Sequence, residues 1–123
     1  LTFDDVLIVP KFSTITSRKD VSLDTTVGDT TLQLPIISSN MDTVTGPEMA
    51  LAMAQAGGRS CLHRFATIEE NVKMLNASQW GFDWDIRKAM VSVGLGKDEL
   101  DRAIALFKAG ADHIVIDVAH GAQ

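Results

Sequence analysis

Apolar and polar residues alternate along this chain in blocks that predict strands and helices by turns. Short blocks rich in β-branched and small apolar residues predict buried strands, and the longer blocks between them repeat apolar residues every three or four positions, as amphipathic helices do. The predicted strands cover residues 36–39, 59–63, 89–94 and 114–116, and the predicted helices cover residues 45–57, 67–76 and 97–109. This alternation predicts a parallel sheet with right-handed crossovers, and hence an α/β fold.

Local signals mark the ends of the predicted helices. Thr45 to Glu48 and Thr67 to Glu70 both have the spacing of a capping box, and Gly57 and Gly110 stand where helices should end. The apolar side chains of the second helix share one face, formed by Ile68, Val72 and Leu75. The buried side of the third helix is predicted to consist of Leu100, Ala103, Ile104 and Phe107.

The last predicted strand leads directly into a polar loop. Ile114, Val115 and Ile116 form a β-branched run of the kind that parallel sheets bury on both faces, and Asp117 ends it with a charge. Ligands of α/β proteins bind at this end of the strands. We therefore expect residues 117–121 to face a substrate or cofactor.

Two α/β architectures fit the alternation, a (β/α)₈ barrel and an open doubly wound sheet. The dinucleotide-fold fingerprint is absent, because Gly94-Leu95-Gly96 follows the third strand and lacks the final glycine. Polar residues stand at the strand ends instead: Ser39 with Met41, His63 with Arg64, Ser92 with Gly94, and Asp117 with His120. A ring of polar strand ends suits the mouth of a TIM barrel.

The barrel interpretation also predicts how the chain is organised. Four βα units are about half of a barrel, so we expect residues 35–123 to form its first half and the remainder of the domain to lie outside this sequence. Residues 1–34 are predicted to form an N-terminal arm of the same domain, with a hairpin turn near Val27-Gly28-Asp29.

Composition limits the classes of function. The 123 residues carry 11 basic and 16 acidic side chains, a formal charge of −5, which argues against nucleic-acid binding. No apolar run reaches membrane-spanning length, and a single cysteine fits a reducing compartment, so we expect a cytoplasmic protein without a membrane contact.

Neither the cysteine nor the histidines predict chemistry of their own. Cys61 falls inside a predicted strand with no neighbour that would lower its pKa, which favours a buried, inert thiol over a nucleophile. A metal site built from Asp117, His120 and His113 is disfavoured, because His113 stands at the far end of its strand. We therefore expect no metal.

Three motifs in order along the chain resemble the IMP dehydrogenase/GMP reductase family of purine-nucleotide barrels. They are Leu1-Thr2-Phe3-Asp4-Asp5-Val6-Leu7, Ser39-Asn40-Met41-Asp42-Thr43-Val44 and Asp117-Val118-Ala119-His120-Gly121. Within the family, His63-Arg64-Phe65, Ser92-Val93-Gly94 and Asp117-Val118-Ala119-His120-Gly121 look closer to GMP reductases. The link at residues 77–88 leaves no room for the regulatory CBS pair that most IMP dehydrogenases carry, although Met41-Asp42-Thr43-Val44-Thr45 also matches dehydrogenases.

The resemblance implies a reaction at the base of a purine nucleotide. The first expectation is reductive deamination of GMP to IMP and ammonia by NADPH, and the alternative is oxidation of IMP to XMP by NAD in an enzyme without CBS domains. A further alternative is a non-catalytic nucleotide-binding half-barrel. The family's catalytic cysteine sits in a loop after the sixth barrel strand, so no catalytic residue is expected in this sequence.

The resemblance also implies a set of binding residues. Asp117 would bind a ribose diol of the cofactor, with Val118 and Ala119 lining the same site, and Arg64 would lie near the cofactor, where a guanidinium suits a 2′-phosphate. Ser17 and Arg18 would reach the cofactor of a neighbouring subunit in the family's homotetramer. Ser39 and Met41 would hold the purine nucleotide. The ordinary alternatives are a helix cap for Asp117, a turn with a core methionine for Ser39 and Met41, and surface arginines for Arg18 and Arg64.

Overall fold

The predicted alternation of strands and helices is present in a computed structural model of the chain, which describes residues 2–79 and 89–121. After an N-terminal region the elements run β3 (Ile37–Ser38), α1 (Pro47–Ala56), β4 (Arg59–Leu62), α2 (Ile68–Ser78), β5 (Met90–Val93), α3 (Lys97–Lys108) and β6 (Ile114–Ile116). The predicted link at residues 77–88 begins later than expected, because residues 77 and 78 belong to α2; residues 80–88 lie outside the described residues.

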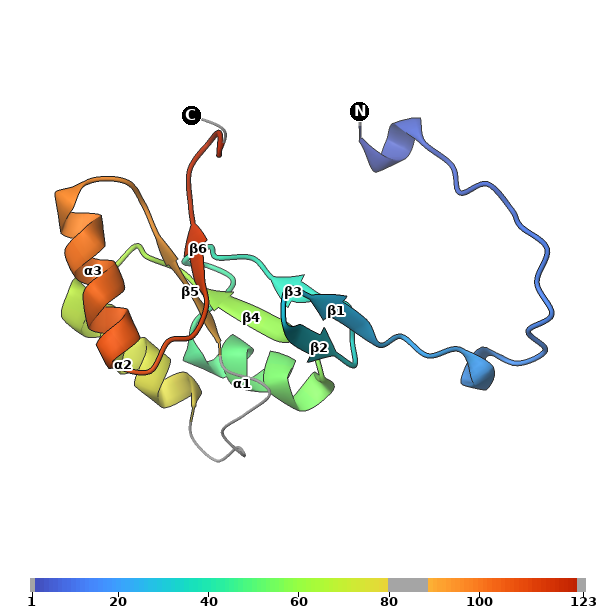
Figure 1. Cartoon of the computed structure of the whole chain (residues 1–123), viewed down its shortest axis with the longest axis horizontal. Helices are drawn as coiled ribbons and strands as arrows, with labels where there is room; N and C mark the ends of the chain where they lie inside the picture. Colours follow the sequence, from blue (N-terminus) through green and yellow to red (C-terminus); the bar gives the residue numbers. More distant parts are fainter. Residues whose placement is uncertain (1, 80–88, 122–123) are drawn as a thin grey trace.

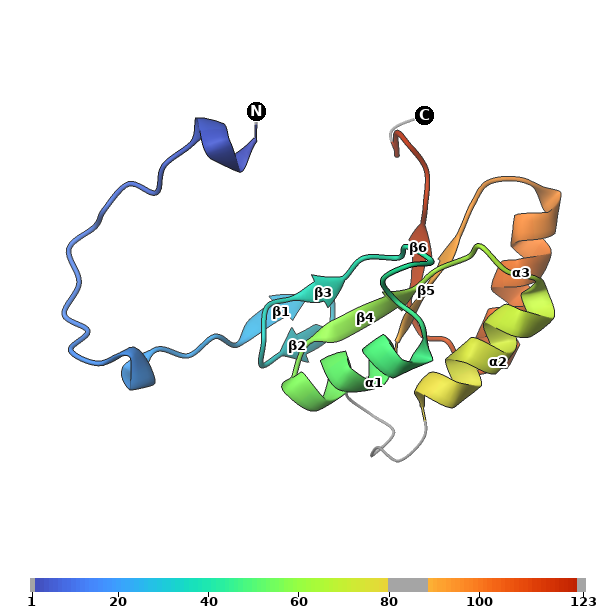
Figure 2. The same ribbon diagram turned by 180° about the vertical axis from the view of Figure 1, so that it is seen from behind.

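The four strands form one sheet in sequence order, β3-β4-β5-β6, with every neighbouring pair parallel. Helices α1, α2 and α3 form a single layer against one face of this sheet, as Figures 1 and 2 show from opposite sides. Because parallel strands point the same way, their carboxyl ends meet along one edge, and the loops that follow them share that edge.

The core lies between the sheet and the helix layer. Leu62 of β4 and Val91 of β5 pack with Leu75 of α2 and Leu106 of α3, and all four side chains are fully buried. Every residue of β4 and β5 is buried, as the sequence pattern predicts for central strands of a parallel sheet.

A hairpin precedes the sheet at the predicted turn. Strands β1 (Thr25–Val27) and β2 (Thr30–Leu32) pair antiparallel around Gly28-Asp29. Gly28 has a φ of 63° at the first turn position, where a two-residue hairpin of type II′ needs glycine. The hairpin is anchored to the start of β4, because the Arg59 guanidinium donates to the Thr30 hydroxyl at 2.6 Å.

The chain before the hairpin forms an extended arm that runs away from the sheet (Figure 1). It contains two short 3₁₀ turns, η1 (Phe3–Asp5) and η2 (Arg18–Asp20). Its apolar side chains are exposed, Leu7, Ile8 and Phe12 among them.

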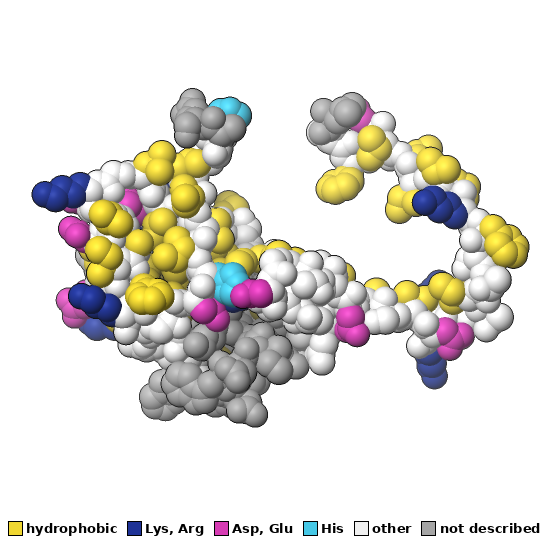
Figure 3. Space-filling view, viewed as in Figure 1, with side chains coloured by type: hydrophobic (Ala, Val, Ile, Leu, Met, Phe, Trp, Pro, Cys, Tyr) yellow, Lys and Arg dark blue, Asp and Glu magenta, His cyan; other side chains and the backbone are white. Residues whose placement is uncertain are grey.

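Two predictions about burial are wrong. On α3, Leu100, Ile104 and Phe107 are 61%, 44% and 70% exposed, because the helix packs on α2 and β5 through the face that carries Ala103 and Leu106. On β6, Ile114 and Ile116 are exposed, because β6 is the edge strand of the described sheet. Hydrophobic side chains accordingly gather on the surface over α3 and β6 in Figure 3.

The predicted capping box at Thr45 to Glu48 is also wrong. Helix α1 begins at Pro47 with Gly46 as its N-cap and has no side-chain cap. Thr45 is fully buried, and its hydroxyl contacts the Ser38 hydroxyl and the Ser39 carbonyl, so it fastens the loop to β3. The second capping box is confirmed, with Thr67 and Glu70 satisfying each other's backbone N–H groups.

Candidate functional site

The ends of three adjacent strands enclose an open pocket of about 580 Å³. The pocket is lined from the loop after β4 by Arg64 and Phe65, from the loop after β5 by Gly94 and Leu95, and from the segment after β6 by Asp117, Val118, Ala119 and His120. The predicted meeting of polar strand ends is therefore confirmed for these strands.

An ion pair crosses this pocket. The Arg64 Nε donates to the Asp117 Oδ2 at 3.0 Å, and the side chains of the two residues are 29% and 30% exposed. Two contacts fix the pair: the Arg64 guanidinium lies 5.0 Å from the centre of the Phe65 ring, and the Asp117 backbone N–H donates to the Val93 carbonyl at 2.7 Å. The pair thus joins β4 to β6 over the end of β5.

Gly94 makes room for this arrangement. A Cβ atom at Gly94 would lie 3.2 Å from both Cζ and Nη1 of Arg64, which is tighter than ordinary van der Waals contact. The Gly94 backbone N–H donates to the Glu99 carboxylate at 2.6 Å. A bare backbone at this point therefore lets the guanidinium pack directly on the loop after β5.

The remaining strand-end residues do not all line the pocket. Ser92 is buried, and its hydroxyl donates to the Leu62 carbonyl at 2.7 Å. The His63 ring stacks on Phe65 with 6.5 Å between the ring centres. Of the predicted pairs from β4 and β5, only Arg64 and Gly94 present groups to the pocket.

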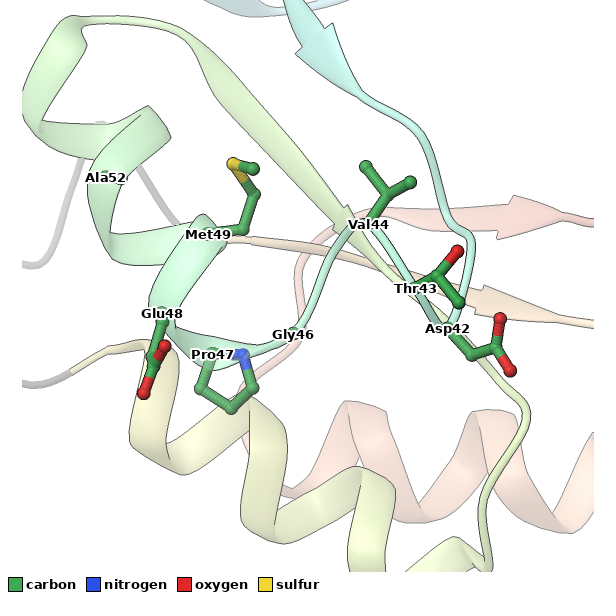
Figure 4. Close-up of a pocket in the computed structure, with 8 residues that line it drawn as sticks. All are labelled: Asp42, Thr43, Val44, Gly46, Pro47, Glu48, Met49 and Ala52. Atoms are coloured by element: carbon green, nitrogen blue, oxygen red, sulfur yellow. The ribbon is translucent and has the colours of Figure 1, made fainter.

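Ser39 and Met41 lie on the loop after β3, at the same edge of the sheet but outside this pocket. Met41 is exposed, and its carbonyl accepts hydrogen bonds from the backbone N–H groups of Val44 and Thr45. The same loop borders a second open pocket of about 670 Å³, which extends along the first turns of α1 (Figure 4). Its charged lining residues are Asp42 and Glu48, so it does not suit a phosphate group.

Ser17 and Arg18 belong to the η2 turn of the extended arm, and this arm runs away from the sheet (Figure 1). Ser17 caps the η2 turn by accepting the Lys19 backbone N–H at 3.2 Å, and Arg18 is exposed. The structure does not bring these two residues together with Arg64 and Asp117.

Cys61 is buried, as predicted, with 3% of its surface exposed. Burial, and next to it the Asp117 carboxylate, raise the pKa of the thiol to about 11, against a smaller lowering by Arg59. The thiol is therefore protonated near neutral pH, which makes it a poor nucleophile.

Within residues 2–79 and 89–121, no group of three or more histidine, cysteine or acidic residues is arranged to hold a metal ion. None of the helices in these ranges is long and apolar enough to cross a membrane.

Sequence reasoning missed three residues that support the pocket from the helix layer, Asn71, Glu99 and Arg102. The one available signal was Glu99 in the first turn of α3, where an acidic side chain can reach back to a free backbone N–H.

Comparison with known proteins agrees with the fold. The family model described as "IMP dehydrogenase / GMP reductase domain" matches residues 1–123. The chain is similar to an inosine-5′-monophosphate dehydrogenase of Nitrosopumilus maritimus (56% identity over 71 residues, 57% of this chain and 15% of that protein). It is also similar to a GMP reductase of Leishmania donovani (46% identity over 76 residues, 61% of this chain and 15% of that protein).

Among solved structures, an inosine 5′-monophosphate dehydrogenase from Legionella pneumophila superimposes with a TM-score of 0.86 at 44% sequence identity. That match covers 100% of this chain and 36% of the other. The chain thus spans between about one seventh and just over one third of the length of these similar proteins.

Proposed function

Because this chain belongs to the IMP dehydrogenase/GMP reductase family, we propose that the full-length protein is a nicotinamide-dependent oxidoreductase acting on the base of a purine nucleotide. The observation that carries the proposal is the Arg64–Asp117 pair in an open pocket at the carboxyl ends of adjacent parallel strands. Such a position suits a ligand site in a barrel.

The residues of the pocket fit part of a nicotinamide dinucleotide. Asp117 uses Oδ2 for Arg64, and among the described residues its Oδ1 remains available to accept hydrogen bonds from the hydroxyls of a ribose. Val118 and Ala119 would line the same site beside it. When bound, the cofactor would take or supply a hydride at the purine, and this chain's part is to hold it in place.

Of the two reaction directions, we place oxidation of IMP to XMP by NAD first. Arg64 already pairs with Asp117, and the Glu99 carboxylate lies close enough for the guanidinium charge to act on it. Two neighbouring carboxylates make Arg64 a poor anchor for the 2′-phosphate of NADPH, since that phosphate carries two negative charges. The dehydrogenase that is 56% identical, against 46% for the GMP reductase, supports the same direction.

Reduction of GMP to IMP and ammonia by NADPH is the second candidate. The motifs that favour it are His63-Arg64-Phe65, Ser92-Val93-Gly94 and the segment Asp117 to Gly121. If ligand binding released Arg64 from Asp117, the guanidinium could pair with a phosphate. Both side chains have the solvent access that such a change needs.

The wider architecture is part of the proposal. We infer that residues 35–123 form the first half of a (β/α)₈ barrel and residues 1–34 its arm. The sequential parallel strands and the uncovered apolar side chains on α3 and β6 support this, because a further βα unit would cover them. Ser39 and Met41 would then contribute to the nucleotide site, and Ser17 and Arg18 would reach a neighbouring subunit of a homotetramer.

Absorbance of the reduced nicotinamide tests the function. Purified full-length protein with IMP and NAD should gain absorbance at that band as XMP and NADH form with uptake of one water. Loss of absorbance with GMP and NADPH instead would establish the reductase. Absence of change with either pair, at concentrations where the nucleotides bind, would leave the non-catalytic nucleotide-binding protein and refute the proposed activity.

A further inference from the structure

A chain of polar contacts lies between α2 and α3, directly beneath the pocket. Buried Asn71 on α2 donates through Nδ2 to the His63 carbonyl at 3.0 Å, and its Oδ1 accepts from Arg102 on α3. Arg102 also donates to the Ala66 carbonyl at 2.9 Å and, through Nε, to Glu99 Oε1 at 3.2 Å. The contacts therefore join the loops after β4 and β5 through the helix layer.

Glu99 is the member of this chain that touches the pocket lining. It is the third residue of α3, and its Oε2 reaches back past the N-cap Gly96 to accept the Gly94 backbone N–H. Because Arg102 lies three positions further along the helix, both side chains stand on one face, where they are only 16% and 12% exposed. A carboxylate in this position is held by two donors.

The same carboxylate acts on Arg64. The backbone hydrogen bond from Gly94 is the largest cause that lowers the pKa of Glu99, and the charges of Arg102 and Arg64 contribute in the same direction. Arg64 in turn packs on Gly94, where an added Cβ atom would crowd both the guanidinium and the Glu99 Cγ. The guanidinium therefore pairs with Asp117 and packs on the same glycine whose backbone N–H is held by Glu99.

We propose that Glu99 is a positioning residue for the cofactor site. It holds Gly94 and attracts the Arg64 guanidinium, and so keeps Arg64 where its Nε orients the Asp117 carboxylate. This inference rests on the proposed function for the identity of the ligand. It assigns to α3 a role in affinity that acts through Arg64, without contact between Glu99 and the cofactor.

The substitution Glu99→Gln in the full-length protein isolates this role. Glutamine keeps an oxygen that can accept the Gly94 N–H but removes the charge that attracts Arg64. The expected result is a rise of about three- to tenfold in the Kd and KM of the nicotinamide dinucleotide, while KM for the purine nucleotide stays within about twofold. The matched control is Asp98→Asn, an exposed acidic residue one position earlier in the same helical turn, which should leave both constants unchanged.

A double-mutant cycle separates positioning from plain structural support. In an Arg64→Gln background, Glu99→Gln should weaken cofactor binding no further, because its effect passes through Arg64. If the rise in cofactor Kd of the double variant equals the product of the two single rises, the inference is overturned. A cofactor Kd within twofold of wild type for Glu99→Gln alone would overturn it too.

Crystal structures of the full-length wild type and the Glu99→Gln variant keep this test apart from the proposed function. If the wild type binds neither NAD nor NADPH in a calorimetric titration, the proposed function fails. A lost Arg64 Nε to Asp117 Oδ2 contact in the variant would then still support the positioning role, whereas the unchanged 3.0 Å contact would refute it.

Discussion

Two arginine–aspartate pairs join β4 to β6, one at each end of the same sheet. Arg59 pairs with Asp112 at the start of the strands, and Arg64 pairs with Asp117 at their carboxyl ends, both at 3.0 Å. The environments differ: the Arg59 side chain is 5% exposed, and it also contacts Thr30 and His113, whereas Arg64 is open to solvent in a pocket.

The difference separates support of the fold from recognition of a ligand. At the amino end the Arg59 guanidinium binds the hairpin to the sheet through Thr30. The His113 Nε2 also lies 2.9 Å from Oδ1 of the hairpin residue Asp29. At the carboxyl end the same pair of residue types remains accessible, so a ligand can exchange partners with it at little expense in stability. In barrels, functional groups are gathered at the carboxyl end and stabilising ones at the other.

The largest expected effect concerns stability at the amino end. Arg59→Met removes, among others, the contacts to Thr30, Asp112 and His113. At about 1 kcal/mol for each of these contacts, it should lower the free energy of unfolding by at least about 3 kcal/mol. Arg64→Met removes one half-exposed pair and should lower it by less than about 1 kcal/mol. Urea denaturation of the two full-length variants measures the free energy of unfolding. Equal losses of this free energy would contradict the assignment of the amino end to stability and the carboxyl end to binding.

The second effect concerns affinity at the carboxyl end. Asp117→Ala deletes the carboxylate proposed to bind the cofactor ribose, so KM for the nicotinamide dinucleotide should rise roughly tenfold to hundredfold. Asp112→Ala is the matched control, because it removes the corresponding aspartate from the amino end and should leave that KM unchanged. An unaltered cofactor KM in Asp117→Ala would refute the proposed contact.

The sequence predicted the order of elements and the meeting of three strand ends, because both depend on local patterns. The β-branched run at residues 114–116 and the polar residue after it are sufficient to place Asp117 at the edge of a parallel sheet. In the folded chain Arg64 comes from a strand two places away in the sheet.

The sequence could not show which apolar faces are covered or which polar groups are buried. Leu100 and Leu106 both fit a buried helical stripe, and only the position of α2 and β5 decides that Leu106 is inside. Thr45 fits a capping box, yet its hydroxyl is used by β3. Glu99 and Arg102 have the spacing of a surface ion pair, and their link to Gly94 and Asn71 depends on how α3 packs.

A smaller effect compares two glycines at opposite ends of the strands. Gly94→Ala places a Cβ against the Arg64 guanidinium, which can shift, so we expect cofactor affinity to fall about threefold with little change in Tm. Gly58→Ala places a Cβ 2.8 Å from the Ile36 backbone oxygen, which cannot shift easily, so it should lower Tm and leave affinity unchanged. Calorimetry and cofactor titration of both variants check the contrast, and a Tm loss for Gly94→Ala as large as for Gly58→Ala would contradict it.

The smallest expected effect is a difference in acid sensitivity between Glu99 and Asp29. Hydrogen bonding lowers the pKa of both carboxylates in the folded chain, from 4.5 for Glu99, mainly through Gly94, and from 3.8 for Asp29, mainly through His113. A lowered folded pKa means that each carboxylate contributes its stability above the ordinary value and loses it as pH falls through the folded value. The Tm difference between wild type and Glu99→Gln should therefore be constant above about pH 4.5 and shrink below it.

For Asp29→Asn the Tm difference should persist to lower pH and begin to shrink near 3.8, because the unfolded chain takes up the proton at that pH. We expect both differences to be at most about 2 °C, since Asp29 is exposed and Glu99→Gln keeps an oxygen for the Gly94 N–H. Scanning calorimetry of the full-length variants between pH 3 and pH 7 measures them. A Glu99 difference that grows on acidification would mean that its carboxylate is destabilised in the folded chain, contrary to the two donors that hold it.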